Sequence, residues 1–314
     1  MENSVKRKLI VITGPTAAGK TELSIKLAKK LDGEIISADS MQVYKGMDIG
    51  TAKIRPSEMQ GIPHHLIDVF EPEHGMNVAE FKSLAKSAIE DIHSRGKLPI
   101  LVGGTGFYIQ AVLYDTEFEE EEENDYRKEL NALAETPEGC EKLYNMLKEE
   151  DPEAAEKIHP NNIKRVIRAI EFKYNTGMKI SEHNVTEKQK ESPYDFTYFV
   201  LTMNRDKLYE RIDKRVDIML QEGLVDEAKG LMDRGLTEDH ISMQAIGYKE
   251  IYQYLAGRMS LEEAVELLKK NTRHFAKRQL TWFRHERTVT WIDKDEFKDE
   301  DSILLYMMSC INTK

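Results

Sequence analysis

The sequence predicts an α/β protein of the phosphate-binding-loop (P-loop) type, in which a parallel sheet is flanked by helices and interrupted by a mostly helical insertion domain. Three observations lead to this prediction. Short β-branched runs alternate with amphipathic helical patterns, a glycine-rich loop joins the first strand to the first helix, and the composition changes near Asp115. We therefore expect a catalytic core formed by residues 1–114 and 197–314, and a helical insertion formed by residues 115–196.

The glycine-rich loop (residues 14–21) fits the pattern Gly, four residues, Gly-Lys-Ser/Thr at every position. Its residues are Gly14, Pro15, Thr16, Ala17, Ala18, Gly19, Lys20 and Thr21. Such a loop brings backbone N–H groups close to phosphate oxygens, Lys20 adds a positive charge, and the Thr21 hydroxyl can ligate Mg²⁺. The pattern predicts a diphosphate or triphosphate site with Mg²⁺ as cofactor. The alternative is an ordinary glycine-rich turn between a strand and a helix.

Two further predicted strands end close to this loop. Residues 33–39 read as a strand that ends on Asp39, and residues 98–102 read as a buried strand followed by two glycines and Thr105. Because the carboxyl ends of parallel strands meet at one edge of a sheet, both ends are expected beside the loop. Asp39 could ligate magnesium or act as a base there, and the alternative is an aspartate that caps a helix.

The predicted insertion has a basic face. Its helical stretch contains Lys164, Arg165 and Arg168, with Val166, Ile167 and Ile170 expected to turn inward, and five consecutive glutamates (Glu119–Glu123) lie near its start. We treat the glutamates as a solvated segment. The basic face is a candidate contact for a phosphate backbone.

The rest of the chain returns to the sheet and then becomes basic. A strand at 196–201 precedes a helix that carries Arg205, Arg211 and Arg215. Arginines on a helix face are by default solvated, but several that converge near a diphosphate site would neutralise its charge. Another helix is predicted from Gln244, and a closing strand at 289–292.

The segment from Lys269 to Arg287 is the most basic in the chain and contains interleaved aromatic residues. Among these we predict Phe275 and Phe283 as core. The accumulated charge favours contact with nucleic acid.

Composition excludes several classes of protein. The 314 residues are 40% hydrophobic and 32% charged, with a net charge of -11, which argues against nonspecific coating of nucleic acid. Cys140 and Cys310 are the only cysteines, so neither a disulfide framework nor a thiolate metal cluster is expected. No apolar run has the length of a membrane span or leader, so we expect a cytoplasmic protein without a membrane partner.

Taken together, the motifs resemble the bacterial tRNA dimethylallyltransferase family, also called isopentenyl-diphosphate:tRNA transferases, along nearly the whole chain. The glycine-rich loop alone is generic, whereas Asp-Ser-Met-Gln-Val-Tyr at 39–44 and Lys-Arg-Gln-Leu-Thr-Trp-Phe-Arg at 277–284 are far more specific. The other matching motifs are Met-Asp-Ile-Gly-Thr-Ala-Lys at 47–53, Gly-Ile-Pro-His-His-Leu-Ile-Asp at 61–68, Gly-Gly-Thr-Gly-Phe-Tyr at 103–108, Ile-His-Pro-Asn-Asn at 158–162, Arg-Ala-Ile-Glu at 168–171 and Gln-Ala-Ile-Gly-Tyr-Lys-Glu at 244–250.

The resemblance implies transfer of a dimethylallyl group from dimethylallyl diphosphate to the exocyclic N6 amine of the tRNA adenosine immediately 3′ of the anticodon, with release of diphosphate. By this analogy Lys20, Thr21 and Arg215 stabilise the leaving diphosphate with Mg²⁺, Asp39 accepts the proton, and Gln42 binds the extruded base. The residues expected to contact the tRNA anticodon stem-loop are Asp39, Ser40, Met41, Gln42, Thr105, Arg127, Lys164, Arg165, Arg168, Gly247, Tyr248, Lys277, Arg278, Gln279, Thr281, Trp282 and Arg284.

Two other classes of protein share parts of this pattern. A P-loop nucleoside or nucleotide kinase would use the same loop to bind ATP, but the insertion and the basic segment are unexplained in a kinase. A noncatalytic nucleotide-dependent RNA-binding protein would not need Lys20, Thr21 and Asp39 together. We expect a monomer, and the pattern leaves open whether a nucleotide also binds the loop.

Overall fold

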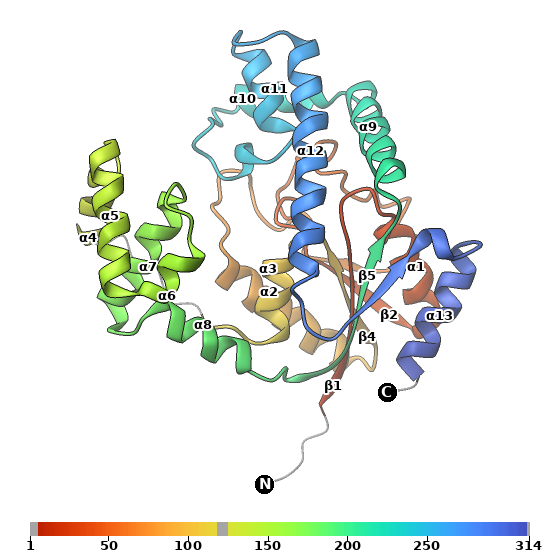
Figure 1. The fold of residues 1–314 in the computed structure, drawn as a ribbon. Helices are drawn as coiled ribbons and strands as arrows, with labels where there is room; N and C mark the ends of the chain where they lie inside the picture. The colour runs from red at the N-terminus through yellow and green to blue at the C-terminus, as the bar shows by residue number, and fades with distance from the viewer. Residues whose placement is uncertain (1–5, 118–124, 313–314) are drawn as a thin grey trace. The chain divides into compact units, whose positions relative to one another are not determined.

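The computed structural model describes residues 6–117 and 125–312, which belong to two compact units (Figure 1). One unit comprises Met1–Asp115 and Ser192–Lys314, and the other comprises Thr116–Glu191. The predicted glutamate run Glu119–Glu123 lies outside the described residues.

A six-stranded parallel sheet forms the centre of the first unit, with the strand order β3-β2-β4-β1-β5-β6. The strands are β1 (Arg7–Thr13), β2 (Gly33–Ser37), β3 (His64–His65), β4 (Leu98–Gly103), β5 (Tyr194–Thr202) and β6 (Val289–Asp293). Ile10 of β1 pairs with Ile100 of β4 on one side and with Thr197 of β5 on the other. This parallel sheet with flanking helices confirms the predicted α/β class.

The helices of this unit follow and cover the strands. They are α1 (Lys20–Leu31), α2 (Val78–Ser94), α3 (Gly106–Leu113), α9 (Arg205–Glu222), α10 (Leu224–Asp233), α11 (Tyr248–Leu255), α12 (Leu261–Phe283) and α13 (Glu300–Asn312), with short 3-10 helices η1 (Ser242–Gln244) and η2 (Lys294–Glu296). Within the described residues, no helix is long and apolar enough to cross a membrane.

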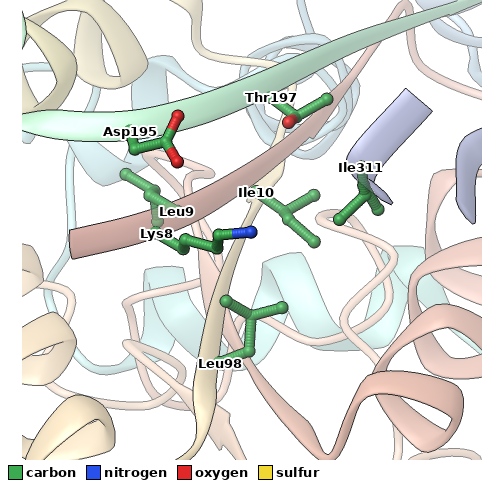
Figure 2. A pocket seen from close by; sticks show the side chains of 7 residues that line it. All are labelled: Lys8, Leu9, Ile10, Leu98, Asp195, Thr197 and Ile311. Carbon is green, nitrogen blue, oxygen red and sulfur yellow. The ribbon is translucent and has the colours of Figure 1, made fainter. Parts of the chain in front are cut away.

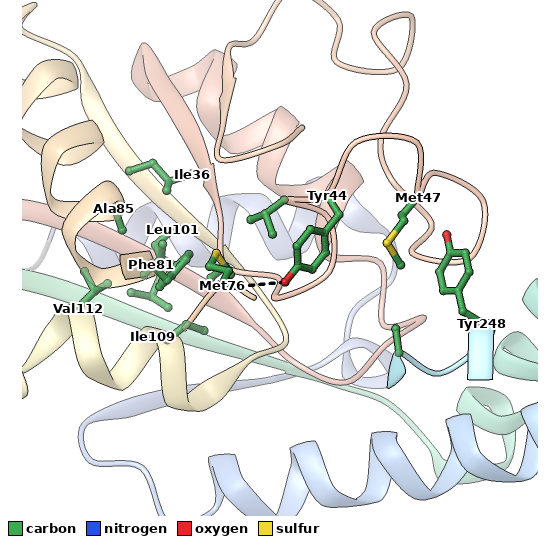
Figure 3. Close-up of a cluster of buried hydrophobic side chains, with 14 of the residues drawn as sticks. Ile36, Tyr44, Met47, Met76, Phe81, Ala85, Leu101, Ile109, Val112 and Tyr248 are labelled. Carbon is green, nitrogen blue, oxygen red and sulfur yellow. Dashed lines mark hydrogen bonds between the residues drawn. The ribbon is translucent and has the colours of Figure 1, made fainter. Parts of the chain in front are cut away.

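Helices pack against both faces of the sheet, so both faces are buried. Because alternate side chains of a strand point to opposite faces, each strand contributes to two cores. Leu9 and Val11 of β1 join a core that includes residues of α2, α3 and α12. Ile10 and Ile12 join a second core with residues of α1 and α13. Figure 3 shows the first core, in which Phe81 and other apolar side chains meet and the backbone N–H of Met76 donates to the buried Tyr44 hydroxyl (3.3 Å).

Three element boundaries differ from the prediction by two residues or more. Strand β2 ends at Ser37, two residues before the predicted end at Asp39. The helix predicted from Gln244 begins only at Tyr248, because Gly247 has φ +108°, which is outside the helical region. Strand β5 begins at Tyr194, two residues before the predicted start at Phe196. The core unit therefore resumes at Ser192, five residues before the predicted boundary at 197.

The second unit is helical and has a core of its own. Its helices are α4 (Asp125–Leu133), α5 (Pro137–Glu150), α6 (Pro152–Lys157), α7 (Ile163–Thr176) and α8 (Ile180–Gln189). Val166, Ile167 and Ile170 of α7 are buried in this core, as their helical spacing predicts. Leu143 and Leu147 of α5 pack against them.

A small pocket lies at the amino-terminal ends of the strands (Figure 2). Its lining is Lys8, Leu9, Ile10, Leu98, Asp195, Thr197 and Ile311. Lys8 of β1 and Asp195 of β5 are register partners there. In parallel α/β sheets the functional groups gather at the carboxyl ends instead, so this pocket is on the wrong edge of the sheet for the predicted chemistry.

Gly103 offers a test of how closely the ends of β2 and β4 must approach. A Cβ added to Gly103 would lie 2.1 Å from the carbonyl oxygen of Ala38, so the Gly103→Ala variant must push the strand ends apart. We expect it to destabilise the fold by about 1–3 kcal/mol, as overpacked sites do. Denaturant unfolding measures the change.

Gly230→Ala is the matched control, because Gly230 lies inside α10 with open space around it. Alanine there should raise stability by up to about 1 kcal/mol through helix propensity. Equal stabilities for the two variants would contradict the close approach at Gly103.

Candidate active site

The glycine-rich loop leaves the carboxyl end of β1 and leads directly into α1. Gly14, Ala17 and Gly19 have φ values of +144°, +64° and +85°, and Gly19 caps a helix that begins at Lys20. The first N–H groups of a helix have no partner within it and carry partial positive charge. The loop therefore places an anion-binding helix terminus at the functional edge of the sheet.

Lys20 is folded back onto this loop. Its ammonium donates to the carbonyl oxygens of Gly14 and Pro15, each at 2.9 Å. The pKa of Lys20 is lowered to about 8, first by burial and then by repulsion from Arg215, while the charge of Asp39 opposes the shift. An anion bound in the loop would favour the charged ammonium.

Two arginines of α9 reach the same loop. Arg211 donates through Nε to the carbonyl oxygen of Ala17 (2.9 Å), and Arg215 donates through Nη1 to the Thr16 hydroxyl (3.4 Å). Burial, followed by repulsion from Arg211, lowers the pKa of Arg215. Arg205 differs, since it is exposed at the start of α9 and lies over the Tyr209 ring. The structure thus brings Arg211 and Arg215 to the loop and gives Arg205 other neighbours.

Asp39 follows the end of β2 and faces these cations. Its carboxylate accepts a hydrogen bond from the backbone N–H of Met41 (2.9 Å). The pKa values of Lys20 and Arg215 are lowered overall, and the negative charge of Asp39 opposes part of both shifts. The three groups therefore share one electrostatic site. A carboxylate can accept a proton or ligate a metal ion, so Asp39 could take either role at this site.

The Thr21 hydroxyl and the Asp39 carboxylate are the oxygen ligands that Mg²⁺ prefers. Thr21 is exposed in the first turn of α1. Within the described ranges, His, Cys, Asp and Glu side chains form no cluster of three that could hold a metal ion. The residues therefore fit a magnesium ion that takes most of its ligands from a bound diphosphate and water, as Mg²⁺ commonly does.

The ends of β2 and β4 are joined by hydrogen bonds. The Thr105 backbone N–H donates to the carbonyl oxygen of Ala38 (3.3 Å), and the Ser40 N–H donates to the Thr105 hydroxyl (3.4 Å). Met41 packs against the core. These bonds hold the segment 39–42 beside the end of β4, the strand next to β1.

Gln42 is held by its side-chain amide. Its Oε1 accepts from the Ser37 hydroxyl (3.2 Å), and its Nε2 donates to the carbonyl oxygen of Thr51 (3.3 Å). Base recognition by Gln42 stays a prediction, and in this structure the same amide groups are used within the protein.

The Gln279 side chain of α12 connects the glycine-rich loop to the segment that follows β4. Its Oε1 accepts from the backbone N–H of Thr16 (2.9 Å), and its Nε2 donates to the carbonyl oxygen of Gly104 (2.9 Å). The side chain is buried, with both ends of its amide satisfied. In this conformation the Gln279 amide connects the two loops, and its predicted tRNA contact stays a prediction.

The other predicted tRNA residues of α12 divide between two faces. Lys277, Arg278, Thr281 and Arg284 are exposed. Trp282 turns inward, where it lies against Gly106, contacts the Phe107 ring edge-on and donates through Nε1 to Glu286 (2.9 Å). The four exposed residues define the basic face of α12.

Tyr248 is fully buried, and its hydroxyl donates to the Glu227 carboxylate (2.6 Å). Glu227 also accepts hydrogen bonds from the backbone N–H groups of Asp48, Ile49 and Gly50. The Tyr248 ring has no accessible surface in this conformation, and the tRNA contact predicted for Tyr248 stays a prediction. The contact predicted for Gly247 stays a prediction.

The predicted tRNA residues of the helical unit lie on its surface. Lys164, Arg165 and Arg168 of α7 are exposed, while Arg127 forms an ion pair with Glu171 (3.0 Å). The three exposed residues keep the basic face that the sequence predicts.

Sequence reasoning missed two residues near the site, Glu227 and Lys294. Lys294 follows β6, and its Nζ lies 2.8 Å from where a Cβ on Gly19 would stand. The prediction of a strand at 289–292 could have pointed to it, because the residue after a parallel strand lies at the functional edge. Glu227 has no comparable signal, since it lies inside an ordinary amphipathic helix.

A parallel sheet whose carboxyl edge carries an anion-binding loop, converging cations and a carboxylate is the architecture of an α/β enzyme that acts on a phosphorylated substrate. The family follows from comparison with known proteins. The model of the family described as IPP transferase matches residues 42–286, and the chain belongs to that family.

Relatives cover nearly the whole chain. A tRNA dimethylallyltransferase of Lachnoclostridium phytofermentans is 58% identical over 307 residues, which are 98% of this chain and 98% of that protein. The crystal structure of a tRNA isopentenylpyrophosphate transferase from Bacillus halodurans matches with a TM-score of 0.75 and 51% identity, covering 98% of this chain and 96% of that one. A eukaryotic dimethylallyltransferase acting on tRNA matches with a TM-score of 0.79 and 37% identity, covering 91% and 74%. These findings confirm the predicted family and enzyme class over the kinase alternative.

The lowered pKa of Lys20 predicts a pH dependence for diphosphate binding. A terminal phosphate loses its last proton with a pKa of about 6, so the charge of a diphosphate is nearly constant above pH 7. As the pH rises above 8, Lys20 becomes mostly neutral in the free protein, and binding must take up a proton. We expect the Kd to rise by up to about tenfold per pH unit between pH 8 and 9.5, and to change little between pH 7 and 7.5. Isothermal titration measures it.

Proton uptake gives a control that needs no variant. Titrations in two buffers with different ionisation enthalpies should show uptake near zero at pH 7 and approaching one proton above pH 9. The Lys20→Arg variant, which stays charged throughout, should lose this dependence if it binds the donor. A flat Kd with no proton uptake in the parent would contradict the lowered pKa.

Proposed function

We propose that the protein transfers a dimethylallyl group from dimethylallyl diphosphate to the exocyclic N6 amine of the tRNA adenosine immediately 3′ of the anticodon, and releases diphosphate. The observation that carries the proposal is the meeting of Lys20, Arg211 and Arg215 at the glycine-rich loop, with Asp39 as the facing carboxylate. The names of the relatives support the acceptor and the transferred group. We also propose that the protein acts as a monomer, and an acceptor tRNA supports action in the cytoplasm.

The cations account for the leaving group. A diphosphate that departs from an allylic carbon gains negative charge as the carbon–oxygen bond breaks, and preorganised positive groups stabilise that charge. Lys20, Arg211 and Arg215 are already held in place by hydrogen bonds to the loop. Bound magnesium would add electrostatic stabilisation of the diphosphate oxygens, with the Thr21 hydroxyl as the protein group that fits it.

Asp39 accounts for the proton. When the N6 amine attacks C1 of the allyl group, the nitrogen becomes positively charged and must lose a proton. The Asp39 carboxylate is held by the Met41 N–H beside Lys20, so it lies near the departing diphosphate. We assign Asp39 as the general base that accepts this proton.

The acceptor requires an RNA surface on a protein whose net charge is -11. The basic face of α12 and the exposed residues Lys164, Arg165 and Arg168 of α7 supply local positive charge. Phosphate contacts of this kind provide affinity, whereas base recognition is assigned to Gln42 in the segment 39–42. No structural observation favours the kinase alternative.

Asp39→Asn tests the general base. Asparagine keeps the size of the side chain and an oxygen for the Met41 N–H, but it cannot accept the proton. We expect single-turnover transfer from labelled dimethylallyl diphosphate to fall by about 10²–10⁴-fold. Filter binding should show tRNA affinity within a few fold of the parent, because affinity is spread over many phosphate contacts. Near-normal transfer would remove Asp39 from the mechanism.

Arg278→Gln tests the basic face of α12. Loss of one phosphate contact should weaken binding of all tRNA substrates alike and reduce the slope of log K against log salt by about one. Lys30→Gln is the control, because Lys30 is an exposed cation at the end of α1. If the two variants show the same affinity and slope, the basic face of α12 is an ordinary solvated surface.

A further inference from the structure

Lys294 brings a cation to the glycine-rich loop from the far end of the chain. It is the first residue after β6 and opens η2. Its Nζ lies 2.8 Å from the Cβ position of Gly19, and an Nη atom of Arg211 lies 3.8 Å from the same point. A Cβ at position 19 would displace the end of the Lys294 side chain, whereas the distance to Arg211 is an ordinary van der Waals contact.

Lys294 is held there by a carboxylate. Its Nζ donates to Glu300 in the first turn of α13 (3.1 Å), and Glu300 also accepts from Lys26 of α1 (2.7 Å). Burial alone would raise the pKa of Glu300, but the hydrogen bonds from Lys26 and Lys294 hold it below its ordinary value. An ammonium carries three N–H donors, and among the described residues Glu300 is the hydrogen-bond partner of Lys294.

The described side chains at the glycine-rich loop carry more positive than negative charge. The side chain of Lys294 is only 15% exposed, and it lies beside the N-terminus of α1, where cations are disfavoured. Lys20, Arg211 and Arg215 lie at the same loop. Glu300 is shared with Lys26, which also pairs with Glu22 (3.1 Å), so the positive charge in excess is that of the cations at the loop. A multiply charged anion in the loop would satisfy all four cations.

We infer that Lys294 is a further ligand of the diphosphate, an assignment that rests on the proposed function. When the donor binds, the ammonium of Lys294 exchanges Glu300 for a diphosphate oxygen. During transfer the bond between N6 and C1 forms, the C1–O bond breaks, its electron pair remains on the diphosphate, and the N6 proton passes to Asp39. Lys294 stabilises the charge that the leaving oxygen gains.

The test is the affinity for inorganic diphosphate, measured by isothermal titration on the full chain. Lys294→Gln should raise the Kd by about tenfold, the effect of losing one charge-assisted hydrogen bond. In steady-state assays the KM for dimethylallyl diphosphate should rise while the KM for tRNA stays unchanged. Lys294→Arg should restore part of the affinity, because it keeps the positive charge.

Two further variants separate ligand binding from a structural role. Glu300→Gln removes the competing carboxylate, so diphosphate should bind as well as in the parent or a few fold more tightly. Lys298→Gln removes an exposed lysine four residues along the chain and should leave the Kd unchanged. If Glu300→Gln weakens binding as much as Lys294→Gln does, the pair is only a brace for α13 and the inference is overturned. An unchanged Kd in Lys294→Gln overturns it as well.

A different result would refute the proposed function without deciding the role of Lys294. A parent protein that binds diphosphate but moves no label from dimethylallyl diphosphate to tRNA refutes the transfer reaction. The diphosphate affinities of the variants then still decide whether Lys294 is an anion ligand.

Discussion

The side-chain amide of Gln279 fixes the spacing between the glycine-rich loop and the end of β4. Its two hydrogen bonds, from Thr16 and to Gly104, must be made together, because a buried amide that loses a partner carries a desolvation penalty of about 1–3 kcal/mol. The rotation of α12 follows from this constraint. With Gln279 turned inward, Trp282 meets Gly106, and Lys277, Arg278, Thr281 and Arg284 face outward. One amide therefore couples the donor site to the orientation of the basic face.

The site at the glycine-rich loop brings several positively charged side chains close together, although their charges repel one another. Lys20 and Arg215 both have lowered pKa values, with burial as the first cause and a neighbouring arginine as the second. This arrangement lowers the stability of the free protein and raises its affinity for an anion. Preorganised charges of this kind need little rearrangement when the leaving group departs, which is their advantage in catalysis.

The sequence predicts the parts of this site that depend on local pattern. The loop at 14–21 and Asp39 after β2 follow from spacing and from the rule for parallel strands, and the inward turn of Val166, Ile167 and Ile170 follows from helical periodicity. Tyr248 and Gln279 could not be assigned in this way, because their partners lie on segments distant in sequence. Motif resemblance marks such residues as important without distinguishing a ligand contact from an internal one. Lys294 likewise reaches the loop only through tertiary folding.

The Glu227 carboxylate has a consequence for where anions can bind. Three consecutive backbone N–H groups, those of Asp48, Ile49 and Gly50, form a concave cluster that would suit a phosphate oxygen. Glu227 already fills this cluster and is fixed there by the Tyr248 hydroxyl. The Glu227 carboxylate thus occupies, in this structure, the position at these three N–H groups that a phosphate oxygen could take. A diphosphate or an RNA backbone therefore cannot bind the N–H groups of residues 48–50 unless Glu227 moves, whereas the glycine-rich loop requires no such displacement of a carboxylate.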